Sequence, residues 1–279
     1  MSFRIGPAGS PDRRGLPATT RWLARNGFRT CELDFGRRFE FTPGQIAAAR
    51  QIATESDISY RAHAPLYAIL AMEHDRPARV NSLVGSLHHS FKVIAALGGW
   101  GLTAHPGFLK GLSTEERVEL CRANAERLHE RLRDGGYDDM RLGLENMAHG
   151  PDFGGLDDII AVCAGSGFTR PVIDWGHYQA HTDGCLRGPD DYRAALERIN
   201  TELGRQVLEE TTFQFSGIEY KDRRERRHLP YLRGDLKLED LLTALTAMNL
   251  NDAIIVFESP LASDLDRFKR VVAEFEGPT

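Results

Sequence analysis

The stretch "PVIDWGHYQAH" (residues 171–181) decides the fold, because it begins as a buried strand and ends on ionisable side chains. Its first residues are apolar, and Asp174, His177 and His181 follow within a few positions. Ordinary strands end on turn residues such as glycine, asparagine or proline. A strand that ends on a carboxylate and two imidazoles points to a site, provided that other strands end in the same way.

Short β-rich runs alternate with longer helical patterns along the whole chain. The predicted strands span residues 3–9, 30–35, 59–65, 101–107, 141–147, 171–177, 212–217 and 253–259. Thr42-Pro43 and the pair Ser113 and Glu116 have the pattern of helix starts. Eight strand–helix units, with strands buried on both faces, predict an α/β fold: a closed parallel (β/α)8 TIM barrel.

The competing fold is a doubly wound open sheet, which usually has fewer strands and a glycine-rich first turn. The segment "GPAGSPDRRG" (6–15) does not match GxGxxG. The chain has 279 residues, and a TIM barrel typically needs about 250. We therefore expect one domain over residues 1–279.

Composition limits the class of partner and the compartment. The formal net charge is −5, so a nucleic-acid partner would need a local basic patch. The four cysteines are far apart, which predicts a reduced chain without a disulfide framework or zinc knuckle. The start of the chain lacks the apolar segment of a signal peptide, and no run approaches the roughly 18 apolar residues of a membrane span. We expect a cytoplasmic monomer that does not enter a membrane.

Polar side chains recur where the predicted strands end, and in a (β/α)8 barrel these ends converge on one face. They are His63, His105, Glu145, Asp174, His177, Gln214 and Glu258, with His228 in the long loop after the seventh strand. Each one alone could be a hydrogen-bonded core residue or a helix cap. Burying so many ionisable groups without counter-charge would cost on the order of several kcal/mol each. Imidazoles and carboxylates are ligands of divalent metals, so the pattern predicts a metal centre.

These residues lie in segments that resemble the endonuclease IV family of apurinic/apyrimidinic endonucleases, within the wider xylose-isomerase-like barrels. The matching segments are "AHAPLY" (62–67), "AHPG" (104–107), "LGLENMA" (142–148), "VIDWGH" (172–177) and "VFES" (256–259). They occur in the family's order across nearly the whole chain. The segments "FSGIEY" (215–220) and "RRHLP" (226–230) are most similar to the archaeal-type branch.

The resemblance implies a trinuclear zinc centre that hydrolyses the phosphodiester 5′ to an abasic sugar in DNA. It assigns His63 and His105 to the first metal, with Glu145 bridging to the second. It assigns Asp174, Glu258 and the residue at Gln214 to the second metal, and His177 and His228 to the third. Glu258, next to the attacking water, and Glu145 would be the catalytic carboxylates. Manganese could replace zinc, because histidine with carboxylate suits either metal.

Two positions depart from the family pattern. Gln214 stands where the family has a histidine ligand, and Arg226 stands where the family has an aspartate two residues before the last histidine. A cation at Arg226 would repel a metal unless its side chain points away. Glu225 could replace the aspartate only through a shift of register. We therefore expect two firmly bound metals, with the third weak or absent.

The expected partner is damaged double-stranded DNA. Leu66 and Tyr67 would enter the duplex at the abasic gap, or would simply cover the top of the barrel. The residues expected to contact phosphates are Arg37, Arg38, Arg223, Arg224 and Arg227. The basic run 221–228 could also be an ordinary solvated loop.

Two other functions fit the same residues. A sugar isomerase or epimerase on this barrel would hold one Mn²⁺ or Mg²⁺ with Glu145, Asp174 and Glu258, whereas the pair His63 and His105 favours more than one metal. A non-catalytic relative that binds DNA or a small ligand is the other alternative, suggested by the two missing ligands.

Overall fold

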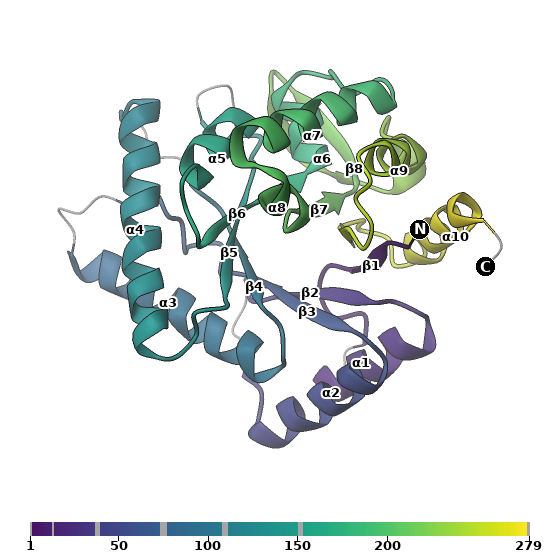
Figure 1. Ribbon diagram of the computed structural model, residues 1–279. Coiled ribbons are helices and arrows are strands. Elements are labelled where there is room, and N and C mark those ends of the chain that lie inside the picture. Colours follow the sequence, from purple (N-terminus) through teal and green to yellow (C-terminus); the bar gives the residue numbers. More distant parts are fainter. Residues whose placement is uncertain are drawn as a thin grey trace.

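Eight parallel strands run through the centre of the protein, as seen in the computed structural model (Figure 1). The structure describes residues 2–12, 14–36, 40–72, 77–107, 111–149 and 153–277. The strands are β1 (Arg4–Pro7), β2 (Thr30–Asp34), β3 (Ser59–His63), β4 (Gly101–Ala104), β5 (Arg141–Glu145), β6 (Thr169–Asp174), β7 (Thr212–Phe215) and β10 (Ile254–Phe257). Their order is β1-β10-β7-β6-β5-β4-β3-β2.

The two ends of this sheet meet. Ala8 forms a parallel bridge with Glu32, the Gly9 amide donates to the Glu32 carbonyl at 2.7 Å, and the Arg29 amide donates to the Ile5 carbonyl at 3.0 Å. These bonds join β1 to β2. The prediction of a (β/α)8 TIM barrel is therefore confirmed, and the doubly wound open sheet is ruled out.

Helices connect the strands and cover the outside of the barrel (Figure 1). They are α1 (Leu16–Arg25), α2 (Pro43–Glu55), α3 (Pro77–Ala96), α4 (Thr114–Asp134), α5 (Leu156–Cys163), α6 (Trp175–His181), α7 (Pro189–Leu203), α8 (Arg205–Glu209), α9 (Leu238–Ala247) and α10 (Asp264–Glu276), with a 3-10 turn η1 (Tyr231–Arg233). Both predicted helix starts form capping boxes: Thr42 accepts from the Gln45 amide and Ser113 from the Glu116 amide. None of the helices in the described ranges is both long and apolar enough to cross a membrane.

The last helix is held to the barrel by an aromatic cluster. Phe268 on α10 is fully buried and stacks on Phe257, with ring centroids 4.2 Å apart and planes at 8°. Its edge contacts Phe215 at 6.0 Å, and Tyr231 lies 4.8 Å away. Aromatic pairs of this kind contribute about 0.5–1.5 kcal/mol beyond the burial of their surface. The cluster therefore anchors the end of β10, and the residue that follows this strand is Glu258.

A β-hairpin follows β7 where the sequence had predicted a long loop, so that expectation is corrected. Strands β8 (Gly217–Lys221) and β9 (Arg224–Leu229) pair antiparallel around Asp222 and Arg223, whose φ values are 55° and 59°. Two adjacent residues with positive φ are typical of the tight turns that join such strands. The backbone of Arg224 also bridges to His149 in the loop after β5, which ties the hairpin to the barrel rim.

The hairpin contains an irregularity in register between Glu219 and Tyr220. Glu219 lies opposite Arg227, and Tyr220 lies opposite Glu225, which makes Arg226 the extra residue of a β-bulge. A bulge changes the direction of the side chains around it. Here Glu225 is half-buried and Arg226 is exposed to solvent.

Candidate metal centre

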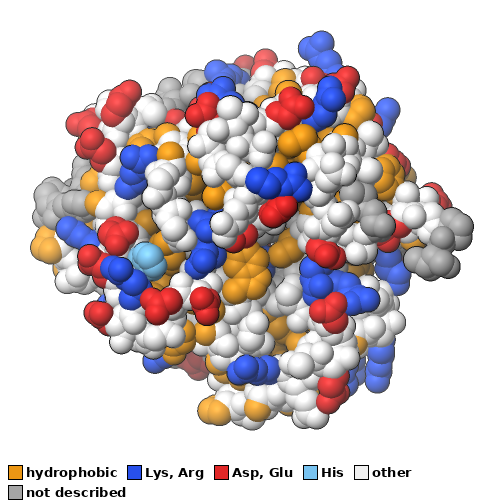
Figure 2. Space-filling model, viewed as in Figure 1, with side chains coloured by type: hydrophobic (Ala, Val, Ile, Leu, Met, Phe, Trp, Pro, Cys, Tyr) orange, Lys and Arg blue, Asp and Glu red, His pale blue; other side chains and the backbone are white. Residues whose placement is uncertain are grey.

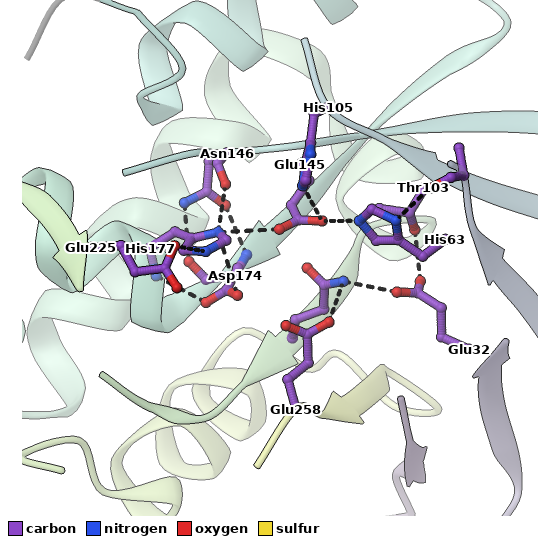
Figure 3. A network of polar contacts seen from close by, with 12 residues as sticks. Glu32, His63, Thr103, His105, Glu145, Asn146, Asp174, His177, Glu225 and Glu258 are labelled. Atoms are coloured by element: carbon purple, nitrogen blue, oxygen red, sulfur yellow. Dashed lines mark hydrogen bonds and ion pairs between the residues drawn. The ribbon is translucent and has the colours of Figure 1, made fainter. Parts of the chain in front are cut away.

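The ends of β3, β4 and β5 bring together a first group, defined as His63, His105 and Glu145 (Figure 3). Nε2 of His63 lies 3.0 Å from Oε2 of Glu145, and Nε2 of His105 lies 3.4 Å from the same oxygen. The two imidazole rings are 4.8 Å apart. Nδ1 of His63 is 2.8 Å from the backbone oxygen of Ala64, which orients the ring and leaves Nε2 toward the carboxylate.

A second group, defined as Asp174, His177 and His228, lies on the other side of Glu145. Asp174 ends β6 and caps α6 by accepting from the His177 amide at 2.9 Å, so the cap places the imidazole beside the strand end. Nδ1 of His177 lies 3.4 Å from Oδ2 of Asp174 and 3.1 Å from Oε1 of Glu145. Glu145 therefore contacts imidazoles through both of its oxygens. His228, on β9, has Nε2 3.9 Å from Oδ2 of Asp174.

Glu225 completes the surroundings of the second group. Its Oε2 lies 3.1 Å from Nε2 of His177, and its Oε1 lies 3.5 Å from Nε2 of His228. The expected repulsion from Arg226 has no basis in this geometry, because the bulge turns Arg226 to solvent and presents Glu225 instead. The sequence signal for Glu225 was its spacing of three residues before His228.

Gln214 and Glu32 form a buried polar layer next to these groups. Nε2 of Gln214 donates to Oε1 of Glu32 at 2.8 Å and to Oε1 of Glu258 at 3.0 Å. Glu32, on β2, also accepts from the Thr103 hydroxyl at 2.6 Å (Figure 3). Nε of the buried Arg61 lies 3.9 Å from Oε2 of Glu32. Sequence reasoning missed Glu32. Its only signal was an acidic residue in the middle of the apolar strand "TCELDF" (30–35).

Burial and close opposite charges strongly shift the acid–base properties of the first group. Burial by itself lowers the pKa of His63, but the hydrogen bond and charge of Glu145 raise it to about 10. Burial opposes ionisation of Glu145 too, yet the charge of His105 and the hydrogen bonds from the imidazoles hold the pKa of this carboxyl well below its usual range.

His177 and Glu258 both have a pKa that lies well above its usual value. Burial lowers the pKa of His177, but the charge of Asp174 and the hydrogen bonds to Glu145 and Glu225 raise it well above its usual value. Burial, followed by the charges of Asp174, Glu145 and Glu32, raises the pKa of Glu258 well above its usual range. A metal-free centre thus retains protons where metal ligands would lose them.

These residues fit divalent cations. Oδ2 of Asp174 and Oε1 of Gln214 are buried and have no hydrogen-bond partner among the described residues. Unpartnered buried oxygens are costly, and a cation would satisfy them. The donor atoms are imidazole nitrogens and carboxylate oxygens around one shared carboxylate. Sites that hold more than one metal ion have donors of this kind.

The residues predicted to contact DNA have different environments. Leu66 and Tyr67 follow β3 directly and are 64% and 69% exposed. The three hairpin arginines each have a partner: Arg223 donates to the His181 carbonyl, Arg224 to the His149 carbonyl and Arg227 to Glu219, at 2.6, 2.6 and 2.8 Å. Arg37 and Arg38 lie outside the described residues. That these residues bind DNA stays a prediction.

The surface carries both signs of charge. Figure 2 shows Lys and Arg side chains interspersed with Asp and Glu on the face that it presents. Together with the net charge of −5, this means that attraction to a polyanion would have to come from a few local cations near the site.

Comparison with known proteins agrees with this architecture. An uncharacterized protein of Methanocaldococcus jannaschii is 28% identical over 205 residues, which cover 74% of this chain and 73% of the relative. Among solved structures, endonuclease IV from Thermus thermophilus matches with a TM-score of 0.75 and 19% identity, covering 97% of this chain and 99% of that one. A D-tagatose 3-epimerase-like protein matches with a TM-score of 0.73 and 17% identity, covering 98% and 97%.

At such identities the two structural matches show a shared fold. The family comparison reaches further, because residues 20–274 match the family described as xylose isomerase-like TIM barrel. That range includes every one of the eight strands except β1. The chain belongs to the xylose isomerase-like TIM barrel family.

Proposed function

We propose that this chain is a metal-dependent hydrolase that cleaves the phosphodiester 5′ to abasic sites in double-stranded DNA. The observation that carries the proposal is Glu145, which has His63 and His105 near one oxygen and His177 near the other. Imidazoles on both sides of one carboxylate provide for more than one cation. Centres with neighbouring cations suit phosphodiester hydrolysis, because both the attacking and the leaving oxygen need stabilisation.

Three positions would hold zinc or manganese. The first consists of His63, His105 and Glu145. The second consists of Glu145, Asp174 and Glu258, with Gln214 beside them. The third consists of His177, His228 and Glu225, so that the structure gives a reason to expect three positions instead of two. Bound cations would neutralise charge on the phosphodiester and lower the pKa of a nearby water.

Glu258 is suited to take the proton from the attacking water. Its Oε1 is held by Gln214 at 3.0 Å, while Oε2 lies 3.7 Å from Nδ1 of His228. Burial and neighbouring carboxylates raise the pKa of Glu258 in the metal-free centre. A carboxylate beside the attacking water is a type of group that takes up its proton. The hydrogen bond from Gln214 keeps Glu258 in place.

Substrate selection would depend on the rim. Leu66 and Tyr67 are exposed, three and four residues after His63, and could fill the space that a missing base leaves in the stack. The similarity to endonuclease IV of Thermus thermophilus supports a DNA substrate, and the relative in Methanocaldococcus jannaschii supports the archaeal-type branch.

One observation favours a second candidate, a sugar epimerase. Glu145 is buried and Glu258 is mostly buried, and the two lie at the ends of separate strands. A pair of carboxyl groups that moves a proton beside a carbonyl would be placed in this way. A D-tagatose 3-epimerase-like protein also shares the fold. Such an enzyme would leave His63 and His105 without a role, which is why we place it second.

A nicking assay separates these functions. The purified chain is incubated with a duplex that contains one tetrahydrofuran abasic analogue, with and without Zn²⁺ or Mn²⁺, and in parallel with ketohexoses. We expect metal-dependent cleavage 5′ to the analogue, which falls by about 100-fold or more in Glu258→Gln. The control Glu119→Gln, exposed on α4, should cleave normally. Epimerised sugar without nicking under any metal would overturn the proposal.

A further inference from the structure

Gln214 occupies the position at which the resemblance places a histidine ligand. Its side-chain amide donates hydrogen bonds but accepts none from the described residues. The side chain is fully buried. Both N–H groups are used, one toward Glu32 and one toward Glu258. Its Oε1 has no hydrogen-bond partner within the described part of the chain. A buried amide oxygen without a partner is costly, so it calls for a cation or a donor.

The orientation of this amide follows from its neighbours. When bound cations keep both carboxyl groups ionised, their oxygens only accept hydrogen bonds and therefore select the NH₂ side of Gln214. The reverse orientation would place the amide oxygen against two negative oxygens. Glu258 follows β10, on one side of β7, and β6 lies on the other side of β7. Oε1 of Gln214 is therefore left on the side of Asp174, its partner in the β6–β7 register.

Asp174 has a complementary oxygen, Oδ2, which lies 3.4 Å from Nδ1 of His177 and 3.9 Å from Nε2 of His228. It is fully buried, its Oδ1 accepts from the His177 amide, and its Oδ2 has no hydrogen-bond partner among the residues described. Two neighbouring strands thus each present a buried oxygen that accepts no hydrogen bond among the described residues. Glu145 and Glu258 add carboxylates from the strands on either side of this pair.

We propose that Asp174, Gln214, Glu145 and Glu258 form an all-oxygen cation position that favours a hard cation, Mn²⁺ or Mg²⁺, more than its neighbours do. The flanking positions contain imidazole pairs, His63 with His105 and His177 with His228, and are suited to Zn²⁺. Carboxylate and carbonyl oxygens suit Mg²⁺ and Mn²⁺, whereas imidazole suits Zn²⁺. The centre would then hold two kinds of metal, and the replacement of histidine by Gln214 is what separates them. This inference rests on the metal centre proposed above and not on its substrate.

The test reads metal binding without DNA. Metal-free protein receives two equivalents of Zn²⁺ and is titrated with Mn²⁺, and the free Mn²⁺ is followed by electron paramagnetic resonance. We expect about one further Mn²⁺ to bind per chain. In Gln214→His, the ratio of Zn²⁺ to Mn²⁺ affinity at this position should rise by about 10-fold or more, the size of change that alterations around metal ligands produce.

Two controls keep the result interpretable. Gln51→His, on the exposed face of α2, adds an imidazole far from the centre and should leave the affinity ratio unchanged. Gln214→Leu removes the amide oxygen and should weaken Mn²⁺ binding while two Zn²⁺ remain bound; circular dichroism and the retained Zn²⁺ report on folding.

The inference is overturned if the two-zinc protein binds no Mn²⁺, or if Gln214→His leaves the ratio of affinities unchanged. Either result would leave the hydrolase proposal intact as long as the nicking assay succeeds. Conversely, selective Mn²⁺ binding without nicking would reject the hydrolase and keep the mixed centre.

Discussion

The carboxylate of Glu225 lies 3.1 Å from Nε2 of His177, although 48 residues separate them. The contact depends on a single extra residue in β9. Neighbouring residues of a strand point in opposite directions. Without the bulge, Glu225 and Arg226 would therefore exchange faces of the hairpin. The hairpin thus decides whether the carboxylate of Glu225 or the guanidinium of Arg226 faces the second group.

Glu225→Gln should lower the number of tightly bound divalent ions by about one per chain, because a neutral amide replaces the carboxylate between two imidazoles. Arg226→Ala should change the metal content little, since Arg226 is exposed. Elemental analysis after desalting measures both. Equal metal content in Glu225→Gln and the parent would show that Glu225 is not a ligand.

Removing the exposed side chain of Tyr67 should weaken binding to abasic duplex more than binding to intact duplex. Stacking of an aromatic side chain with bases is worth about 1–3 kcal/mol, so we expect a loss of roughly 5- to 150-fold for Tyr67→Ala. Stability should change by less than about 0.5 kcal/mol, because the side chain is 69% exposed. Fluorescence anisotropy with both duplexes tests this. Phe275→Ala, near the end of α10, serves as the control, and an equal loss on intact DNA would argue against insertion at the gap.

Arg227 provides a test of phosphate contacts. Its side chain is 71% exposed and paired with Glu219, so it is accessible to a polyanion. Arg227→Ala should reduce the slope of log affinity against log salt by about one. Arg131→Ala, near the end of α4, should leave the slope unchanged. A parent protein whose DNA affinity does not depend on salt would contradict a nucleic-acid substrate altogether.

Metal binding should release protons near neutral pH. In the metal-free chain, Glu145 outweighs burial and raises the pKa of His63 to about 10, so this imidazole is protonated at about pH 7.5, whereas a metal ligand must be deprotonated. A raised pKa also stabilises the metal-free fold below the unfolded value of about 6.5, and this contribution is lost as pH rises through about 10. Metal affinity should therefore increase with pH across that window. Calorimetry in buffers of different ionisation enthalpy measures the protons, and a heat independent of buffer would refute the prediction.

Phe268→Ala should destabilise the fold without touching the metal groups. The ring is fully buried against Phe257, Phe215 and Tyr231, so truncation should lower the free energy of unfolding by about 3–5 kcal/mol. Phe268→Leu, which keeps more of the volume, should cost less than half of that. Urea denaturation followed by circular dichroism gives both values. A loss below about 1 kcal/mol for Phe268→Ala would mean that α10 is not anchored by this cluster.

The barrel and the meeting of most candidate side chains at the strand ends could be predicted from local patterns. Alternation of short apolar strands with helices indicates parallel strands, and parallel strands bring their carboxyl ends to one face whatever the details of the loops. His63, His105, Glu145 and Asp174 needed no further information, because each is the last residue of a strand or follows within one or two positions of it.

Other features depended on contacts between distant parts of the chain. The bulge that selects Glu225 over Arg226 arises from the pairing of β8 with β9, and one residue of shift reverses the outcome. Glu32 meets Gln214 across 182 residues, and this contact decides which end of the amide is free. Register and hydrogen-bond direction are properties of paired segments, so a pattern within one segment does not contain them.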